Sequence, residues 1–96
     1  MKISILDAQH TIFEGTVSMV ILPGADGELS LLDDHEPIFA ALAKGYIQLV
    51  PYSKRLTVQQ TGAEAGSAQE TREIKPVFVN RGLARMRNNE LVILVE

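Results

Sequence analysis

The sequence has 96 residues and a mass of 10.5 kDa, enough for one small domain with a single hydrophobic core. Its hydrophobic fraction of 46% predicts a folded chain, and a formal charge of −3 argues against a broad nucleic-acid-binding face. The lack of cysteine excludes disulfides and cysteine-based zinc sites and favours a reducing compartment. No apolar run approaches the roughly 18 residues of a membrane-spanning helix, and no signal-peptide pattern opens the chain, so we expect a soluble domain.

Short β-strand patterns cover the first third of the chain. They are rich in β-branched residues or alternate polar and apolar side chains, and they cover residues 2–5, 11–22 and 28–32. Gly15, inside the second pattern, indicates a β-bulge or a close backbone approach. Residues 23–27 have the composition of a turn, and an acidic segment ends the third strand at residues 33–37.

The remaining residues continue in the same manner. Residues 38–43 form an apolar run that fits either a buried strand or a helical turn. Further strand patterns cover residues 45–50, 55–60, 73–79, 83–86 and 91–95, and the last is apolar throughout, which predicts burial on both faces. Asn88-Asn89 predicts a tight turn, and the small, polar residues around 61–71 predict a mobile loop.

These patterns predict an all-β fold. Seven to ten short strands, with turn signals every 8–12 residues, are typical of an antiparallel sandwich or barrel. The sequence shows no amphipathic helix of three or more turns, no internal repeat and no linker. We therefore expect residues 1–96 to form one domain.

The sequence offers little for catalysis. A metal site would have to combine His35 with Asp33, Asp34 or Glu36, but adjacent carboxylates point in different directions and match no ligand spacing. Neither a phosphate-binding glycine loop nor a nucleophile elbow is present. We predict no catalytic residue, no metal site and no cofactor.

Charge is segregated along the chain. Residues 23–37 contain no lysine or arginine but five acids: Asp26, Glu28, Asp33, Asp34 and Glu36. Between residues 71 and 87 a single acid, Glu73, accompanies five bases: Arg72, Lys75, Arg81, Arg85 and Arg87. These are either solvated faces or the two sides of an adaptor that binds two partners. Strand alternation places Arg85 opposite Ala84 and Met86, so we expect it to be exposed.

One long block of the sequence comprises Phe13-Glu14-Gly15-x-Val17, Pro23-Gly24-x-x-Gly27-Glu28-Leu29 and His35-x-Pro37. This block resembles the N-terminal domain of the epsilon subunit of F-type ATP synthases. Ala41-Leu42-x-x-Gly45 and the final strand extend the resemblance over nearly the whole chain. The sequence departs from the family pattern at Ser30, at Asp33-Asp34 in place of Pro-Gly, and at Arg81, and its segment between residues 51 and 75 is longer.

The resemblance implies a ten-stranded antiparallel β-sandwich of two five-stranded sheets at the foot of the central stalk. There the domain would bind the gamma subunit and rest on the polar loops of the c-ring, without inserting into the bilayer. It would be a peripheral protein on the cytoplasmic side of a bacterial inner membrane. Relatives often continue into a helical hairpin that binds ATP. Because this sequence ends at Glu96, just after the last predicted strand, we expect no nucleotide site in it.

Few site residues can be transferred through the resemblance. Glu28 falls at the family's acidic position in the loop that faces the c-ring, and His35 falls at its histidine near gamma and the ring. By proximity, Asp26, Asp33 and Asp34 are assigned to the same acidic end. The alternative roles are a turn-capping carboxylate for Glu28 and, for His35, a hydrogen bond to a backbone carbonyl.

The resemblance implies a non-catalytic rotor subunit that couples gamma to the c-ring during proton- or sodium-driven ATP synthesis. The main alternative is a diverged β-sandwich that binds a small ligand or peptide in a pocket between Phe39, Tyr46 and Tyr52. These residues, with Leu42, fit either the core or a partner-binding patch. A third alternative, a metal-dependent hydrolase, rests on His35 and its acidic neighbours.

Overall fold

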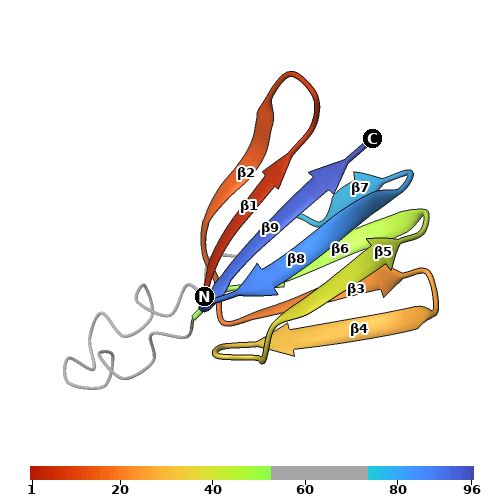
Figure 1. Cartoon of the computed structure of the whole chain (residues 1–96). Coiled ribbons are helices and arrows are strands. Elements are labelled where there is room, and N and C mark those ends of the chain that lie inside the picture. Colours follow the sequence, from red (N-terminus) through yellow and green to blue (C-terminus); the bar gives the residue numbers. More distant parts are fainter. Residues whose placement is uncertain (53–73) are drawn as a thin grey trace, which may run out of the picture.

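The computed structural model describes residues 1–52 and 74–96, which contain nine β-strands (Figure 1). The strands are β1 (Lys2–Leu6), β2 (Thr11–Thr16), β3 (Met19–Gly24), β4 (Gly27–Leu32), β5 (Ile38–Leu42), β6 (Gly45–Val50), β7 (Val77–Val79), β8 (Gly82–Arg87) and β9 (Glu90–Val95). This confirms the all-β prediction and settles residues 38–42 as a strand. The strand expected at 55–60 and the loop expected at 61–71 lie outside the described residues.

The strands form one curled sheet whose two halves face each other (Figure 1). One half has five strands in the order β2-β1-β9-β8-β5, and the described strands of the other are β4-β3-β6-β7. A single residue pair, Gly24 with Leu42, joins β3 to β5 and so connects the halves. Neighbouring strands are antiparallel except β1 and β9, which are parallel. The prediction of a wholly antiparallel arrangement was therefore wrong at this pair, because the first strand lies beside the last.

The core lies between the two halves. Alternate side chains point inward, and the fully buried ones come from both halves: Ile3, Ile5, Val20, Leu22, Leu31, Ile47, Met86, Leu91 and Ile93. Full burial of each such side chain contributes about 1.5–3 kcal/mol. A slip of one residue in any strand would turn its apolar side chains to solvent, so the alternation also fixes the register.

Two predicted strand details differ from the structure. The bulge lies at Ile12, because Ile5 pairs with Phe13 and Leu6 with Thr11, whereas Gly15 pairs regularly with Ile3. Strand β9 is buried on one face only: Leu91 and Ile93 are fully buried, but Leu94 is 51% exposed. The prediction of burial on both faces was wrong because Leu94 faces outward, and no described segment covers the outer surface of the sheet.

The turns agree with the sequence. Asn88 and Asn89 adopt the left-handed conformation, with φ of 52° and 58°, and close the hairpin between β8 and β9. The β3–β4 hairpin turns through Ala25 and Asp26, and Gly27 follows with φ of 124°, a value that favours glycine. Both turns are tight, so the side chains near them are held on rigid supports.

Gly82 offers a test of the close packing around β8. A Cβ atom at this position would lie 2.4 Å from the carbonyl oxygen of Leu94, a backbone atom that cannot rotate away. We expect Gly82→Ala to lower the free energy of unfolding by about 1–3 kcal/mol in urea titrations. Gly15→Ala is the control, since its Cβ would meet the Phe13 ring at 3.2 Å and that side chain can move. Equal stability of the two variants would contradict the packing argument.

Candidate functional site

Strand β4 divides the predicted site residues into two groups. Asp26 and Glu28 lie at its beginning, whereas Asp33, Asp34 and His35 follow its end. A six-residue strand spans about 17 Å, so the two groups sit at opposite ends of the strand. The prediction that these acids share one acidic end was therefore wrong, because an extended chain converts short sequence separation into distance.

The first group forms an exposed acidic tip on the β3–β4 hairpin. Asp26 occupies the two-residue turn and Glu28 the second position of β4, paired with Pro23. Both residues are exposed. The hairpin ladder holds the two carboxylates at the surface, where they are available to a basic partner group.

Asp33 serves the fold. Its carboxylate accepts a hydrogen bond from the N-terminal ammonium of Met1, and the Tyr52 hydroxyl lies 2.8 and 2.7 Å from its two oxygens. The ammonium also donates to the Tyr52 hydroxyl oxygen at 2.7 Å and to the Val17 carbonyl at 2.8 Å. We call Met1, Asp33 and Tyr52 the N-terminal cluster. It ties the start of β1 to the segments that follow β4 and β6.

The cluster shifts the titration of both side chains. Hydrogen bonds from the Met1 ammonium, and then from Tyr52, lower the pKa of Asp33 below its usual 3.8. The same Asp33 carboxylate raises the pKa of Tyr52 above its usual 10.0. The Asp33 side chain is 39% exposed, so its charge is partly visible at the surface although its oxygens are engaged.

Asp34 and His35 complete the loop after β4. Asp34 has a φ of 60°, and its backbone N–H donates to Asn89 Oδ1 at 2.7 Å, which links this loop to the β8–β9 turn. His35 Nδ1 lies 2.8 Å from the carbonyl oxygen of Glu36, so as the Nδ1–H tautomer it donates there. This contact matches the alternative role foreseen for a loop histidine, and the half-buried ring keeps its Nε2 atom for another partner.

The five-stranded half presents an apolar outer face. Phe39 on β5, Leu83 on β8 and Leu94 on β9 are 68%, 44% and 51% exposed. Leu83 pairs with Leu94, and Leu94 with Leu6, so the leucines form a continuous row across three strands. We call this surface the outer sheet face. The sequence prediction missed Leu83 and Leu94, although alternation with buried Ala84 would have placed Leu83 there.

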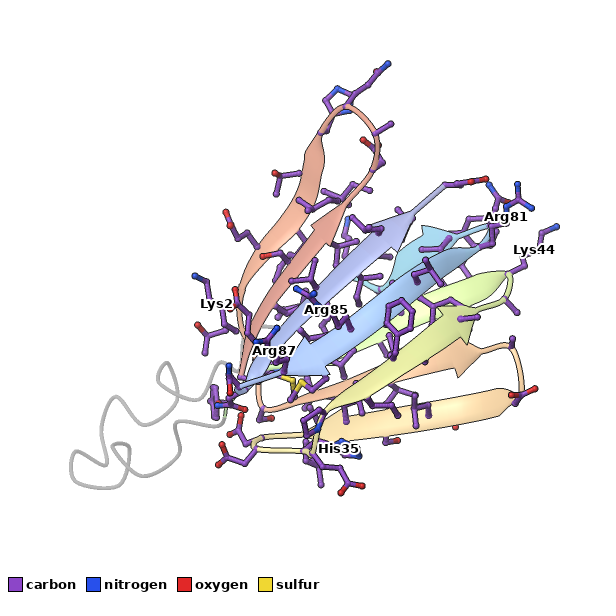
Figure 2. The ribbon with its side chains drawn as sticks, in the orientation of Figure 1. Lys2, His35, Lys44, Arg81, Arg85 and Arg87 are labelled. Atoms are coloured by element: carbon purple, nitrogen blue, oxygen red, sulfur yellow. The ribbon has the colours of Figure 1, made fainter. Side chains whose placement is uncertain are left out.

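The same face carries cationic side chains. Arg85 is exposed, as predicted, between buried Ala84 and Met86, and Arg87 follows on the same side of β8. Figure 2 shows Lys2, Arg85 and Arg87 toward one end of the domain and Lys44 and Arg81 toward the other. The exposed leucines and arginines together give this face the mixed character of a protein-binding surface.

The three aromatic residues of the alternative ligand pocket have separate surroundings. Phe39 lies on the outer sheet face, whereas Tyr46 packs edge-to-face on Phe78, with ring centroids 5.2 Å apart, on the outside of the other half. Tyr52 belongs to the N-terminal cluster. The arrangement therefore does not support a pocket between Phe39, Tyr46 and Tyr52. Leu42, by contrast, is buried in the core.

Within residues 1–52 and 74–96, no three histidine or acidic side chains gather as metal ligands would. No helix in this part of the chain is long and apolar enough to cross a membrane.

Comparison with known proteins places the whole chain in one family. The family model described as "ATP synthase, Delta/Epsilon chain, beta-sandwich domain" matches residues 1–96. The chain belongs to this family. The resemblance noted in the sequence and the β-sandwich fold are thereby both confirmed.

Individual relatives agree with this assignment. The chain is 30% identical over 96 residues to the ATP synthase epsilon chain of Lawsonia intracellularis and 28% identical over 95 residues to that of Desulforamulus reducens. It spans 58% of the length of each. A chain from the Tetrahymena thermophila mitochondrial ATP synthase central stalk/c-ring structure shares the fold, with a TM-score of 0.66 at 11% identity over 98% of this chain and 61% of that one.

The N-terminal cluster predicts a specific pH dependence of stability. Since folding lowers the pKa of Asp33, its contribution is present above pH 3.8 and is lost as the pH falls through the lower, folded value. We expect Asp33→Asn to melt at a lower temperature than the wild type at pH 7, and the difference to shrink below pH 3.8. Thermal melts followed by circular dichroism measure this difference in melting temperature.

Asp26→Asn is the control, since its carboxylate lies on the exposed hairpin turn. Its melting temperature should match that of the wild type both at pH 7 and below pH 3.8. A constant difference between Asp33→Asn and the wild type across the acid range would contradict the role given to the Asp33 charge.

Proposed function

We propose that the domain is a non-catalytic rotor part of an F-type ATP synthase, coupling the gamma subunit to the c-ring during proton- or sodium-driven ATP synthesis. The observation that carries this proposal is the family match over residues 1–96. The shared fold with a chain of the Tetrahymena central stalk/c-ring structure supports a stalk position. The domain would then be peripheral, on the cytoplasmic side of a bacterial inner membrane, with no active site of its own.

A coupling element has to transmit torque without deforming, and the fold suits this demand. Backbone ladders run across both halves, and the inner side chains are close-packed. The N-terminal cluster fixes the first strand to two loops. Each contact with a partner needs an interface on the order of 800 Å² to persist through rotation.

The two groups of site residues suit two partners. In our proposal Asp26 and Glu28 meet basic groups on the c-ring loops, because they project from a rigid exposed tip. Asp33, Asp34 and His35 belong to the opposite end of β4, which we assign to the side of gamma. Asp33 would act there by holding the loop in shape, and His35 by offering its Nε2 atom. The outer sheet face supplies the apolar area of the gamma contact.

Charge reversal on the β3–β4 hairpin tests the c-ring contact. We expect Glu28→Lys to weaken binding of the gamma-bound chain to purified c-ring by about tenfold at low salt, because like charges would then face each other. The effect should shrink at high salt, where exposed charges are screened. Glu14→Lys, on exposed β2 in the other half of the sheet, makes the same charge change, and its preformed complex with gamma should bind the c-ring normally. Equal binding of the two variants at low salt would remove the electrostatic part of the proposal.

Binding to gamma tests the proposal as a whole. The chain is co-expressed with the gamma subunit from the same genome and the mixture is resolved by size-exclusion chromatography. We expect a one-to-one complex, because the outer sheet face exposes apolar side chains that a partner would cover. Clean separation, with the chain folded by circular dichroism, would overturn the stalk proposal.

A further inference from the structure

We propose that Arg85 and Arg87 form a carboxylate-binding site that docks an acidic segment of the gamma subunit onto the outer sheet face. The inference rests on the proposed function, which makes gamma the partner of this face. It adds the chemistry of recognition: two guanidinium groups that select a partner with an aspartate or glutamate beside an apolar side chain.

Strand register places the two arginines between an apolar and a polar row. Arg85 pairs with Phe39 of β5 on one side and with Val92 of β9 on the other. The pair of Leu83 and Leu94 lies two residues from Arg85 along β8, so its side chains are on the same face of the sheet. Arg85 is therefore a cation with apolar neighbours, which displace water around its guanidinium once a partner covers the face.

Arg87 lies in the more polar row. It pairs with Glu90 of β9, and Glu90 pairs in turn with Lys2 of β1. Glu90 thus lies between two cations and offsets part of their charge. Arg85 and Arg87 project from the same side of β8, and their Cα atoms are about 7 Å apart along the strand. A partner carboxylate between the two guanidinium groups therefore relieves the repulsion of the like charges.

Two shallow grooves meet at the arginines. One, of about 320 Å³, is lined by both arginines together with Pro37, Ile38, Phe39 and Met86. The other, of about 230 Å³, is lined by both arginines together with Asn88, Glu90 and Val92. A chain segment lying across β8 would place an apolar side chain in the first groove and a carboxylate against the guanidinium groups.

The charge pattern favours an acidic occupant. The chain as a whole carries −3, so a pair of cations beside apolar side chains departs from its average surface. Among the described residues, the ion pairs are Met1 with Asp33, His10 with Asp7 and Arg81 with Glu96, none of which uses Arg85 or Arg87. Within residues 1–52 and 74–96, both guanidinium groups are thus available to a partner.

A protein segment fits this surface better than a phosphate group. Phosphate sites are typically lined by converging backbone N–H groups, whereas here the backbone N–H groups of β8 are used in ladders with β5 and β9. The exposed row of Phe39, Leu83 and Leu94 would stay uncovered beside a bound phosphate but would be buried by a polypeptide.

The experiment measures the affinity of gamma for the wild-type chain and for single charge-reversal variants at 150 mM salt. We expect Arg85→Glu to raise the Kd at least about thirtyfold, because it loses a pair and places two carboxylates together. Lys44→Glu makes the same charge change in the β5–β6 turn, at the other end of the domain (Figure 2), and should stay within about twofold of the wild type. The Kd of Arg85→Lys should fall between those of Lys44→Glu and Arg85→Glu, since lysine keeps the charge but cannot bind a carboxylate through two parallel N–H groups.

Single Asp→Lys and Glu→Lys changes in gamma then identify the occupant. One of them should weaken binding to the wild-type chain and restore binding to Arg85→Glu. Circular dichroism melts establish that every variant is folded, which is expected because Arg85 is exposed.

Each other outcome overturns the inference in a distinct way. If wild type and Arg85→Glu bind gamma equally, the carboxylate site is wrong and the proposed function stands. If Arg85→Glu and Lys44→Glu weaken binding equally, only net charge matters. If inorganic phosphate at millimolar concentration displaces gamma from the wild-type chain but not from Arg85→Glu, the site is a phosphate site. If folded wild-type chain does not bind gamma, the proposed function fails as well.

Discussion

The structure depends on the burial of the inner side of one half of the sheet against the other. Ile3, Ile5, Leu22, Leu91 and Ile93 are fully buried, and they come from both halves. Among the described strands, the halves share a single ladder pair, Gly24 with Leu42, so the packing of inner side chains contributes most of what holds them together. The outer surface follows from the same constraint, because each inward residue leaves its neighbours facing out. Phe39, Leu83 and Leu94 are exposed for this reason, and a partner can use them without disturbing the core.

Much of the fold was predictable because strand alternation and turn chemistry are local. The exposure of Arg85 followed from buried Ala84 and Met86, and the left-handed Asn88-Asn89 turn followed from the tolerance of asparagine for positive φ. Pairings between distant segments were not predictable in this way. The parallel contact of β1 with β9 joins the two ends of the sequence, and the bulge at Ile12 is defined by its partner strand. Neither leaves a local pattern.

In the candidate site, too, features set by local sequence were predictable and features set by distant contacts were not. Asp26 and Glu28 lie on an exposed tip, and the composition of residues 23–27 predicted the turn that forms it. The role of Asp33 was hidden, because it depends on the Met1 ammonium, 32 residues away in sequence, and on Tyr52. Sequence proximity placed Asp33 with Asp26, whereas the extension of β4 separates them. A carboxylate in an acidic run can therefore belong to the framework, and only its contacts distinguish it from a neighbour that faces a partner.

The departure of this chain from the family pattern at Asp33-Asp34 has a physical explanation. Where the pattern has Pro-Gly, Asp34 adopts a φ of 60°, a conformation that glycine takes freely and aspartate tolerates at some cost in free energy. The Asp33 carboxylate binds the N-terminal ammonium, a contact that a proline cannot make. The backbone N–H of Asp34 donates to Asn89 Oδ1, a bond that a glycine at this position could also form. The loop before His35 is thus fixed by side-chain hydrogen bonds, and it is joined through Asn89 to the same β8–β9 hairpin that carries Arg85 and Arg87. A partner that contacts both the loop and the arginines therefore meets one connected, rigid surface.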